Sequence, residues 1–319
     1  MVITDPLAPT LGNSVLSIAP GRRGGRGASH QGCTSPDGRF HYSGNTHARI
    51  ERFDLSDRTT TGGVVASGFA NDSADVLCDG QGTVYAVLSA GGRRSNNNNN
   101  FGNLGTYQVV RYTEDLQELG RVKLTGGANQ GYARAALSPD GQTIAIPGEG
   151  DIMLVDVVTM RAIDANPATP EVDGLEAGFI NEARIRGLAW SPDSATLYAH
   201  SWRNGGIVRF AFQGGTATRT SIREDVQSGR GGEIEVAPDG RVWLTNESLG
   251  VDVYTPATGM ITDTSYNGGA RGIEFVGGRI YVLRNDRQNV DEIDATGATL
   301  RSFSLAAASQ QHWLSSTRN

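Results

Sequence analysis

The fold is most evident in the stretch AALSPDGQTIAIPGEGDIMLVD, residues 135–156. A short apolar segment leads into the turn Ser138-Pro139-Asp140-Gly141, a second apolar segment follows at Thr143–Ile146, and a third occupies Ile152–Asp156. Pro, Asp and Gly adopt turn dihedrals at low cost, and short apolar runs between turn residues indicate strands. The stretch therefore predicts three consecutive antiparallel strands.

The same unit recurs along the whole chain. Its turns are anchored at residues 37, 79, 140, 193, 239 and 278, which are separated by 42, 61, 53, 46 and 39 residues. Such spacing is typical of propeller blades, and a single blade cannot bury both of its faces alone. We predict an all-β, six-bladed β-propeller with four antiparallel strands per blade. A seven-bladed ring that uses both termini is the alternative.

The domain organisation follows from this repeat. We expect residues 1–319 to form one propeller domain, with an N-terminal arm at 1–12 and a C-terminal tail at 306–319. Strand-like segments at about 13–18 and at Phe303–Leu305 could close the ring. The run of Asn96–Asn100 is low-complexity sequence and predicts a loop.

Several of these units resemble blades of known propellers. Leu137–Asp156 resembles a YVTN-type repeat, and Gly187–Phe210 is similar to a blade of the gluconolactonase and senescence-marker propellers. Arg241–Asn246 resembles the tryptophan-bearing blades of streptogramin lyases, and the whole pattern fits the broader NHL-type superfamily. These resemblances imply the propeller fold and leave the substrate open, because one fold hosts many functions.

Composition narrows the possible partners and compartments. The 34 acidic and 28 basic residues give a net charge of −6, which offers no overall positive field for nucleic acid. The first residues resemble no export signal, and no apolar run is long enough to span a membrane. We therefore expect no nucleic-acid or membrane partner and a cytoplasmic or virion-associated protein. Cys33 and Cys78 are the only cysteines, and we expect buried free thiols.

One face of the predicted ring carries the longer connections, whereas the opposite face carries tight turns. We call the face with long connections the top face and the other the turn face. The long segments are Gly91–Gly105, Asp164–Asn181, His200–Gly206 and Asn285–Asn289. Because variable loops on a rigid scaffold commonly bind ligands, we expect the working surface on the top face.

Arginines that precede inner strands should surround the axial opening of the top face. Two interpretations are open. Guanidinium groups could bind an anion or a sugar-derived ligand, or they could pair with neighbouring acids and plug the channel. The candidate binding residues are Arg134, Arg186, Arg230, Arg271, His200, Trp202, Glu182 and Asn246, with Glu149 and Glu247 nearby.

The sequence gives little support for a metal cofactor. At the positions where lactonase-like propellers bind a divalent metal, the resemblance places Arg186-Gly187 and Ser201, which supply no suitable charge. His41 and His47 have no third ligand beside them. Asp72 and Asp75 could offer two carboxylates to Ca²⁺, although a turn with Asx-type hydrogen bonds is the favoured explanation. We expect no cofactor, with Ca²⁺ as the one open possibility.

These observations favour a non-catalytic propeller that acts as a rigid binding or structural module, as a subunit of a larger assembly such as a phage virion. Its partners would be other protein subunits or a surface glycan, the latter through Trp202, whereas Trp243 is expected in the core. The alternative is a lactonase-like or streptogramin-lyase-like hydrolase or lyase with its active site at the axial mouth, where His200 is the best-placed base.

Overall fold

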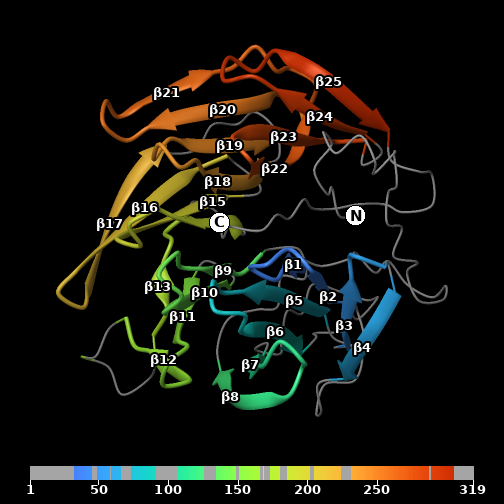
Figure 1. Ribbon diagram of the computed structural model, residues 1–319. Coiled ribbons are helices and arrows are strands. Elements are labelled where there is room, and N and C mark those ends of the chain that lie inside the picture. The colour runs from blue at the N-terminus through green and yellow to red at the C-terminus, as the bar shows by residue number, and fades with distance from the viewer. Residues whose placement is uncertain are drawn as a thin grey trace, which may run out of the picture.

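The computed structural model describes residues 32–44, 49–57, 59–65, 73–90, 106–125, 134–148, 151–165, 168, 173–179, 185–201, 205–223, 231–286 and 289–304. These residues form an all-β protein without helices, in which six antiparallel sheets are arranged around an axis as a six-bladed β-propeller (Figure 1). The prediction of six blades with four antiparallel strands each is confirmed. Within the described residues no helix is long and apolar enough to cross a membrane.

Each blade is a simple meander whose strands follow chain order, from the axis outward. Blade 1 has β1 (Gly32–Thr34), β2 (Phe40–Gly44), β3 (Arg49–Asp54) and β4 (Thr59–Val65); blade 2 has β5 (Ser73–Cys78), β6 (Val84–Ala90), β7 (Thr106–Tyr112) and β8 (Glu118–Thr125); blade 3 has β9 (Ala136–Leu137), β10 (Thr143–Pro147), β11 (Asp151–Asp156), β12 (Arg161–Ile163) and β13 (Leu175–Glu176).

The remaining three blades continue this order around the ring. Blade 4 has β14 (Ile185–Trp190), β15 (Thr196–Ser201), β16 (Ile207–Gln213) and β17 (Thr216–Arg223); blade 5 has β18 (Gly231–Val236), β19 (Val242–Asn246), β20 (Gly250–Thr255) and β21 (Met260–Asp263); blade 6 has β22 (Ala270–Val276), β23 (Arg279–Arg284), β24 (Asn289–Ile293) and β25 (Thr299–Ser304).

Local side-chain chemistry forms the tight turns that join the first and second strands. The Ser138 hydroxyl donates to Asp140 Oδ1 at 2.5 Å and accepts the Thr143 backbone N–H at 2.9 Å. Gly141 adopts a φ of 70°, a conformation that costs glycine little. The Ser191 hydroxyl makes the same two bonds in blade 4. The repeated turn therefore fixes the register of each inner hairpin.

The hydrophobic core lies in slabs between neighbouring blades. On β11, Ile152 and Leu154 pack toward blade 4, whereas Met153 and Val155 pack toward blade 2. Successive strand residues point to opposite faces, so a strand buried on both faces becomes a continuous apolar run. Trp243 is fully buried, as predicted, and packs edge-on against Phe275 of blade 6.

The long segment after blade 3 differs from its prediction as a top-face loop. Both β12 and β13 pair with β11, at Leu154↔Ile163 and Ile152↔Leu175. They occupy successive parts of one outer edge, and the Ala165 N–H bonds to the Asp173 carbonyl at the base of the intervening segment. This insertion therefore interrupts the fourth strand at the periphery of the ring.

Two further predictions require correction. Cys33 and Cys78 are joined by a disulfide with a Cα–Cα distance of 5.6 Å, because the inner strands of blades 1 and 2 lie side by side. Phe303 belongs to β25, the fourth strand of blade 6, rather than to a separate ring-closing strand. The predicted arm 1–12, the closing segment 13–18, the tail 306–319, the Asn96–Asn100 loop and His47 lie outside the described residues.

Candidate functional site

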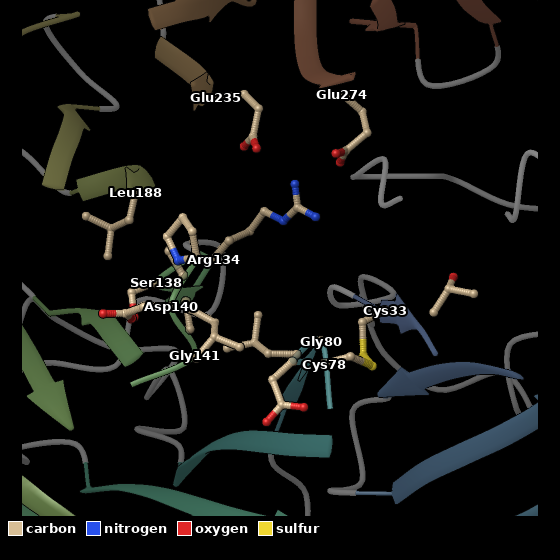
Figure 2. Close-up of a pocket in the computed structure, with 18 of the residues that line it drawn as sticks. Cys33, Cys78, Gly80, Arg134, Ser138, Asp140, Gly141, Leu188, Glu235 and Glu274 are labelled. Atoms are coloured by element: carbon tan, nitrogen blue, oxygen red, sulfur yellow. A yellow bond between two sulfur atoms is a disulfide. The ribbon is translucent and has the colours of Figure 1, made fainter. Parts of the chain in front are cut away.

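A cavity of about 430 Å³ lies on the axis and is bordered by residues of all six blades. Binding sites for small ligands commonly have volumes of this order. The inner strands β1, β5, β14, β18 and β22 contribute lining residues, as do the segment around β9 and the turns of blades 1, 2 and 3 (Figure 2). The cavity is therefore a product of ring assembly.

The two ends of the cavity differ in exposure. Arg134 and Glu233 line it and are 8% and 2% exposed. Pro36, Gly80 and Pro139 line it too and are exposed residues of the inner-hairpin turns. The cavity consequently opens toward the turn face, opposite to the top face where the sequence predicted the working surface.

At the buried end of the cavity, an ion pair and a hydrogen bond to the same carboxylate connect three blades. Arg134, just before β9, pairs with Glu233 of β18. The other carboxylate oxygen of Glu233 accepts the Ile273 backbone N–H of blade 6 at 3.0 Å. One carboxylate thus connects blades 3, 5 and 6 beside the axis.

Two glycines permit close packing around this ion pair. A Cβ at Gly272 would lie 2.5 Å from Glu233 Oε2, and one at Gly187 would lie 2.9 Å from both the backbone N and Cγ2 of Ile234. Real Cβ atoms essentially never come this close to another heavy atom. Gly187 therefore lets β14 and β18 approach closely, and Gly272 leaves space for the Glu233 carboxylate.

The described wall of the cavity is predominantly acidic. Glu235 and Glu274 face Arg134 from the opposite wall in Figure 2. Glu235 is partly buried and Glu274 is buried. The ionisable residues of the described lining are Asp79, Asp140, Glu233, Glu235 and Glu274 on the acidic side and Arg134 on the basic side. A positively charged group is the natural complement of this wall.

Two more of the predicted arginines meet at a second carboxylate. Glu247 accepts a hydrogen bond from Arg271 at 2.6 Å and lies 3.6 Å from Arg186, so it connects blades 4, 5 and 6. All three side chains are buried. The Thr245 hydroxyl lies 3.1 Å from the carbonyl oxygens of both Glu233 and Arg271. This cluster joins blades around the axis.

His200 lies inside the protein rather than in an accessible mouth. It is 1% exposed, and a Cβ at Gly231 would lie 2.9 Å from its Nε2. Burial lowers the pKa of His200 to about 3, with the Arg223 and Arg186 charges adding to the effect and the Gly232 backbone opposing it. The adjacent Ser201 is fully buried as well. The imidazole is therefore neutral across the physiological pH range.

The remaining candidate residues either make hydrogen bonds that support the fold or lie outside the described residues. The Asn246 side chain accepts the backbone N–H groups of Ser248 and Leu249, which caps the turn after β19. Asp75 accepts the Ala135 N–H across the boundary between blades 2 and 3. Arg230, Trp202, Glu182, Glu149 and Asp72 lie outside the described residues. Within the described ranges, no three His, Cys, Asp or Glu side chains are grouped as metal ligands would be.

Sequence reasoning missed the acidic wall, although a signal was available. Glu233 and Glu235 are two residues apart on one strand and hence share a face. In register, Glu235 pairs with Trp243, and Glu274 pairs with Tyr281 on the matching hairpin of blade 6. Acidic residues on adjacent inner strands predict a charged channel once the blades are placed around an axis.

Fold and cavity together define a six-bladed β-propeller with an acid-lined axial cavity. No family model and no curated protein matches the chain. Among solved structures, hydrazine synthase from Kuenenia stuttgartiensis is similar with a TM-score of 0.60, 17% identity, and coverage of 89% of this chain and 79% of that one. A putative 6-phosphogluconolactonase from Bacteroides uniformis has a TM-score of 0.61, 17% identity, and coverage of 86% and 85%. At this identity the likeness shows the fold alone.

Proposed function

We propose that this chain is a non-catalytic binding propeller whose axial cavity receives a cationic group, a primary amine or a guanidinium, from the turn face. The observation that carries the proposal is the cavity itself, with a described lining of five carboxylates and one arginine. A cation in this cavity would gain charge-assisted hydrogen bonds, which are stronger than neutral ones.

The wall supports selective binding because it is held rigidly. Arg134 is fixed by Glu233, and the Glu233 carboxylate is fixed in turn by the Ile273 N–H. Glu235 and Glu274 stand on the inner strands β18 and β22, in the paired part that follows the register shift of each strand. Preorganised groups lose little conformational entropy when a ligand binds. An amine would therefore meet carboxylates already in place.

The contacts of the predicted axial mouth support the hydrolase or lyase alternative less than they support a binding module. Arg134, Arg186 and Arg271 form ion pairs with Glu233 and Glu247. A general base must come within hydrogen-bond reach of its substrate, and His200 is 1% exposed. Turnover of a lactone or ester, lost in Arg186→Ala, would favour the enzymatic alternative.

The cationic group can come from a small diamine or from a lysine or arginine side chain of a protein partner. A protein partner agrees with the expectation that this chain is a subunit of a larger assembly. That the assembly is a phage virion stays a prediction from the sequence. Titration with 1,4-diaminobutane and with Nα-acetyl-lysine amide, followed by calorimetry, distinguishes the two sources. Butanoate is the matched anionic control and should not bind.

Variants connect any observed binding to the cavity. In Glu235→Gln and Glu274→Gln the shape of the wall is kept while one charge is removed, so we expect affinity for the amine probes to fall about tenfold for each. Glu176→Gln, which alters an exposed residue of β13, should bind as the parent does. An absence of amine binding, or equal losses in all three variants, would contradict the proposal.

A further inference from the structure

The Cys33–Cys78 disulfide joins two blades that share no sheet. Cys33 lies on β1 and Cys78 is the last residue of β5, and the two strands belong to separate four-stranded sheets. Neighbouring blades otherwise meet through side-chain packing and individual hydrogen bonds or ion pairs, here through a core that includes Tyr42, Ile50 and Val76. The disulfide is therefore a covalent link across a non-covalent boundary.

Among the described residues, the inner strand of blade 1 has only a short pairing within its own sheet. β1 has only three residues and pairs with three residues of β2. Tyr42 and Arg52 donate hydrogen bonds to blade 2, and both reach the Glu114 carbonyl in the turn between β7 and β8. The disulfide secures β1 itself, on the wall of the cavity.

Both cysteines line the cavity and can be reached through it. Cys33 is 8% exposed and Cys78 is partly exposed. The exposed residues Gly80 and Gln81 follow Cys78 at the opening on the turn face. Figure 2 shows the Cys33–Cys78 bond beside Gly80 in this wall. A small thiol can therefore approach Cys78 from the turn face.

We propose that this disulfide is a redox-sensitive clasp that holds blade 1 against blade 2 and so sets the shape of the axial cavity. A thiolate of a small dithiol attacks the Cys78 sulfur, forms a mixed disulfide and releases the Cys33 thiolate, which takes up a proton. The second thiol of the reductant then displaces Cys78 and closes the reductant's own disulfide. Two cysteine thiols result, and the inner end of blade 1 is released.

Native reduction of the full-length protein tests the clasp. The protein is incubated with dithiothreitol without denaturant, alkylated with iodoacetamide and weighed by mass spectrometry, with the untreated protein as control. We expect two alkylated cysteines after reduction and none before. Failure to alkylate either cysteine under native conditions would overturn the proposal, because the disulfide would then be closed to reductant.

Hydrogen exchange measures what the clasp does to the fold. Reduction should raise exchange rates about tenfold or more in residues 32–65, since local opening follows lost constraints, and should leave residues 242–263 of blade 5 unchanged. Unchanged exchange in blade 1 would overturn the proposal. The double variant Cys33→Ala/Cys78→Ala should show the reduced pattern with or without dithiothreitol. If that variant does not fold, the comparison of exchange rates between the oxidised and the reduced parent protein still tests the clasp.

The expected effect of disulfide reduction on the cavity rests in part on the proposed function. The clasp and the proposed function can nevertheless be contradicted separately. If the oxidised protein binds 1,4-diaminobutane, reduction should weaken that binding about tenfold or more as the wall between blades 1 and 2 loosens. If the oxidised protein binds no amine, the proposed function fails. The alkylation and exchange results would still test the clasp by themselves.

Discussion

Arg134 of blade 3 reaches past the inner strand of blade 4 to pair with Glu233 of blade 5. Beside this pair, Gly187 of blade 4 has no side chain where β14 meets β18, and the two inner strands approach closely there. A contact between blades that are not neighbours in the ring resists their separation in a way that pairwise packing does not. This ion pair therefore lies at the buried end of the axial cavity and also braces the ring.

Removing the charge of Glu233 should destabilise the protein strongly. Glu233→Gln keeps an acceptor for the Ile273 N–H but leaves the buried Arg134 guanidinium without its carboxylate, and breaking a buried pair costs about 3–5 kcal/mol. Urea unfolding measures this loss. Glu176→Gln on the exposed edge should change stability by no more than about 0.5 kcal/mol. Equal stability of the two variants would show that the brace contributes nothing.

Adding one methyl group between β14 and β18 should loosen the same region. In Gly187→Ala the new Cβ would lie 2.9 Å from the Ile234 backbone nitrogen, and overpacking of this kind costs about 1–3 kcal/mol. Gly80→Ala is the matched control, because no atom lies within 4 Å of its Cβ position, and it should be neutral or stabilising by up to about 1 kcal/mol. Thermal unfolding compares them, and a neutral Gly187→Ala would contradict the close approach.

The turns were predictable because their chemistry is local. The Ser138 hydroxyl bonds to both Asp140 and Thr143 within six residues, so the pattern alone indicates a hairpin and its repetition indicates blades. The start of each inner strand also followed from the repeat, which is why Arg134, Arg186 and Arg271 were expected near the axis.

The partners of these residues were not predictable in the same way. Glu247 was expected near the arginines, but Glu233 was not, and which arginine each carboxylate pairs with depends on the distance between blades. Cys33 and Cys78 gave no local signal of a disulfide, since only the adjacency of β1 and β5 brings them to a Cα–Cα distance of 5.6 Å. The insertion before β13 looked like a loop between blades because a two-residue strand leaves almost no trace of periodicity.

Two buried histidines should make stability depend on pH. Burial lowers the pKa of His41 and of His200 to about 3, whereas an exposed histidine in the unfolded chain titrates near 6.5. Below about pH 6.5 the unfolded chain binds protons that the folded chain does not, so stability falls as the pH drops from there toward 3. The two residues together contribute a slope of about 2.7 kcal/mol per pH unit.

Urea unfolding at a series of pH values between about 7.5 and 5 measures this slope. In His200→Gln one of the two groups is removed, so the slope between pH 6.5 and 5 should fall by about half. His312→Gln, which alters a residue outside the described ranges, is the control for a histidine substitution in general. A flat profile in the parent protein would mean that neither imidazole is buried in a neutral state.

Narrowing the opening on the turn face should block the cavity without weakening the fold. Gly80 is exposed, lines the cavity and has open space at its Cβ position, so Gly80→Trp can be accommodated with a stability change of no more than about 0.5 kcal/mol. The indole would stand at the entrance and reduce the affinity for 1,4-diaminobutane about tenfold or more, whereas Gly80→Ser should bind normally. Undiminished binding in Gly80→Trp would place the amine elsewhere, and the top face would then be the surface to probe.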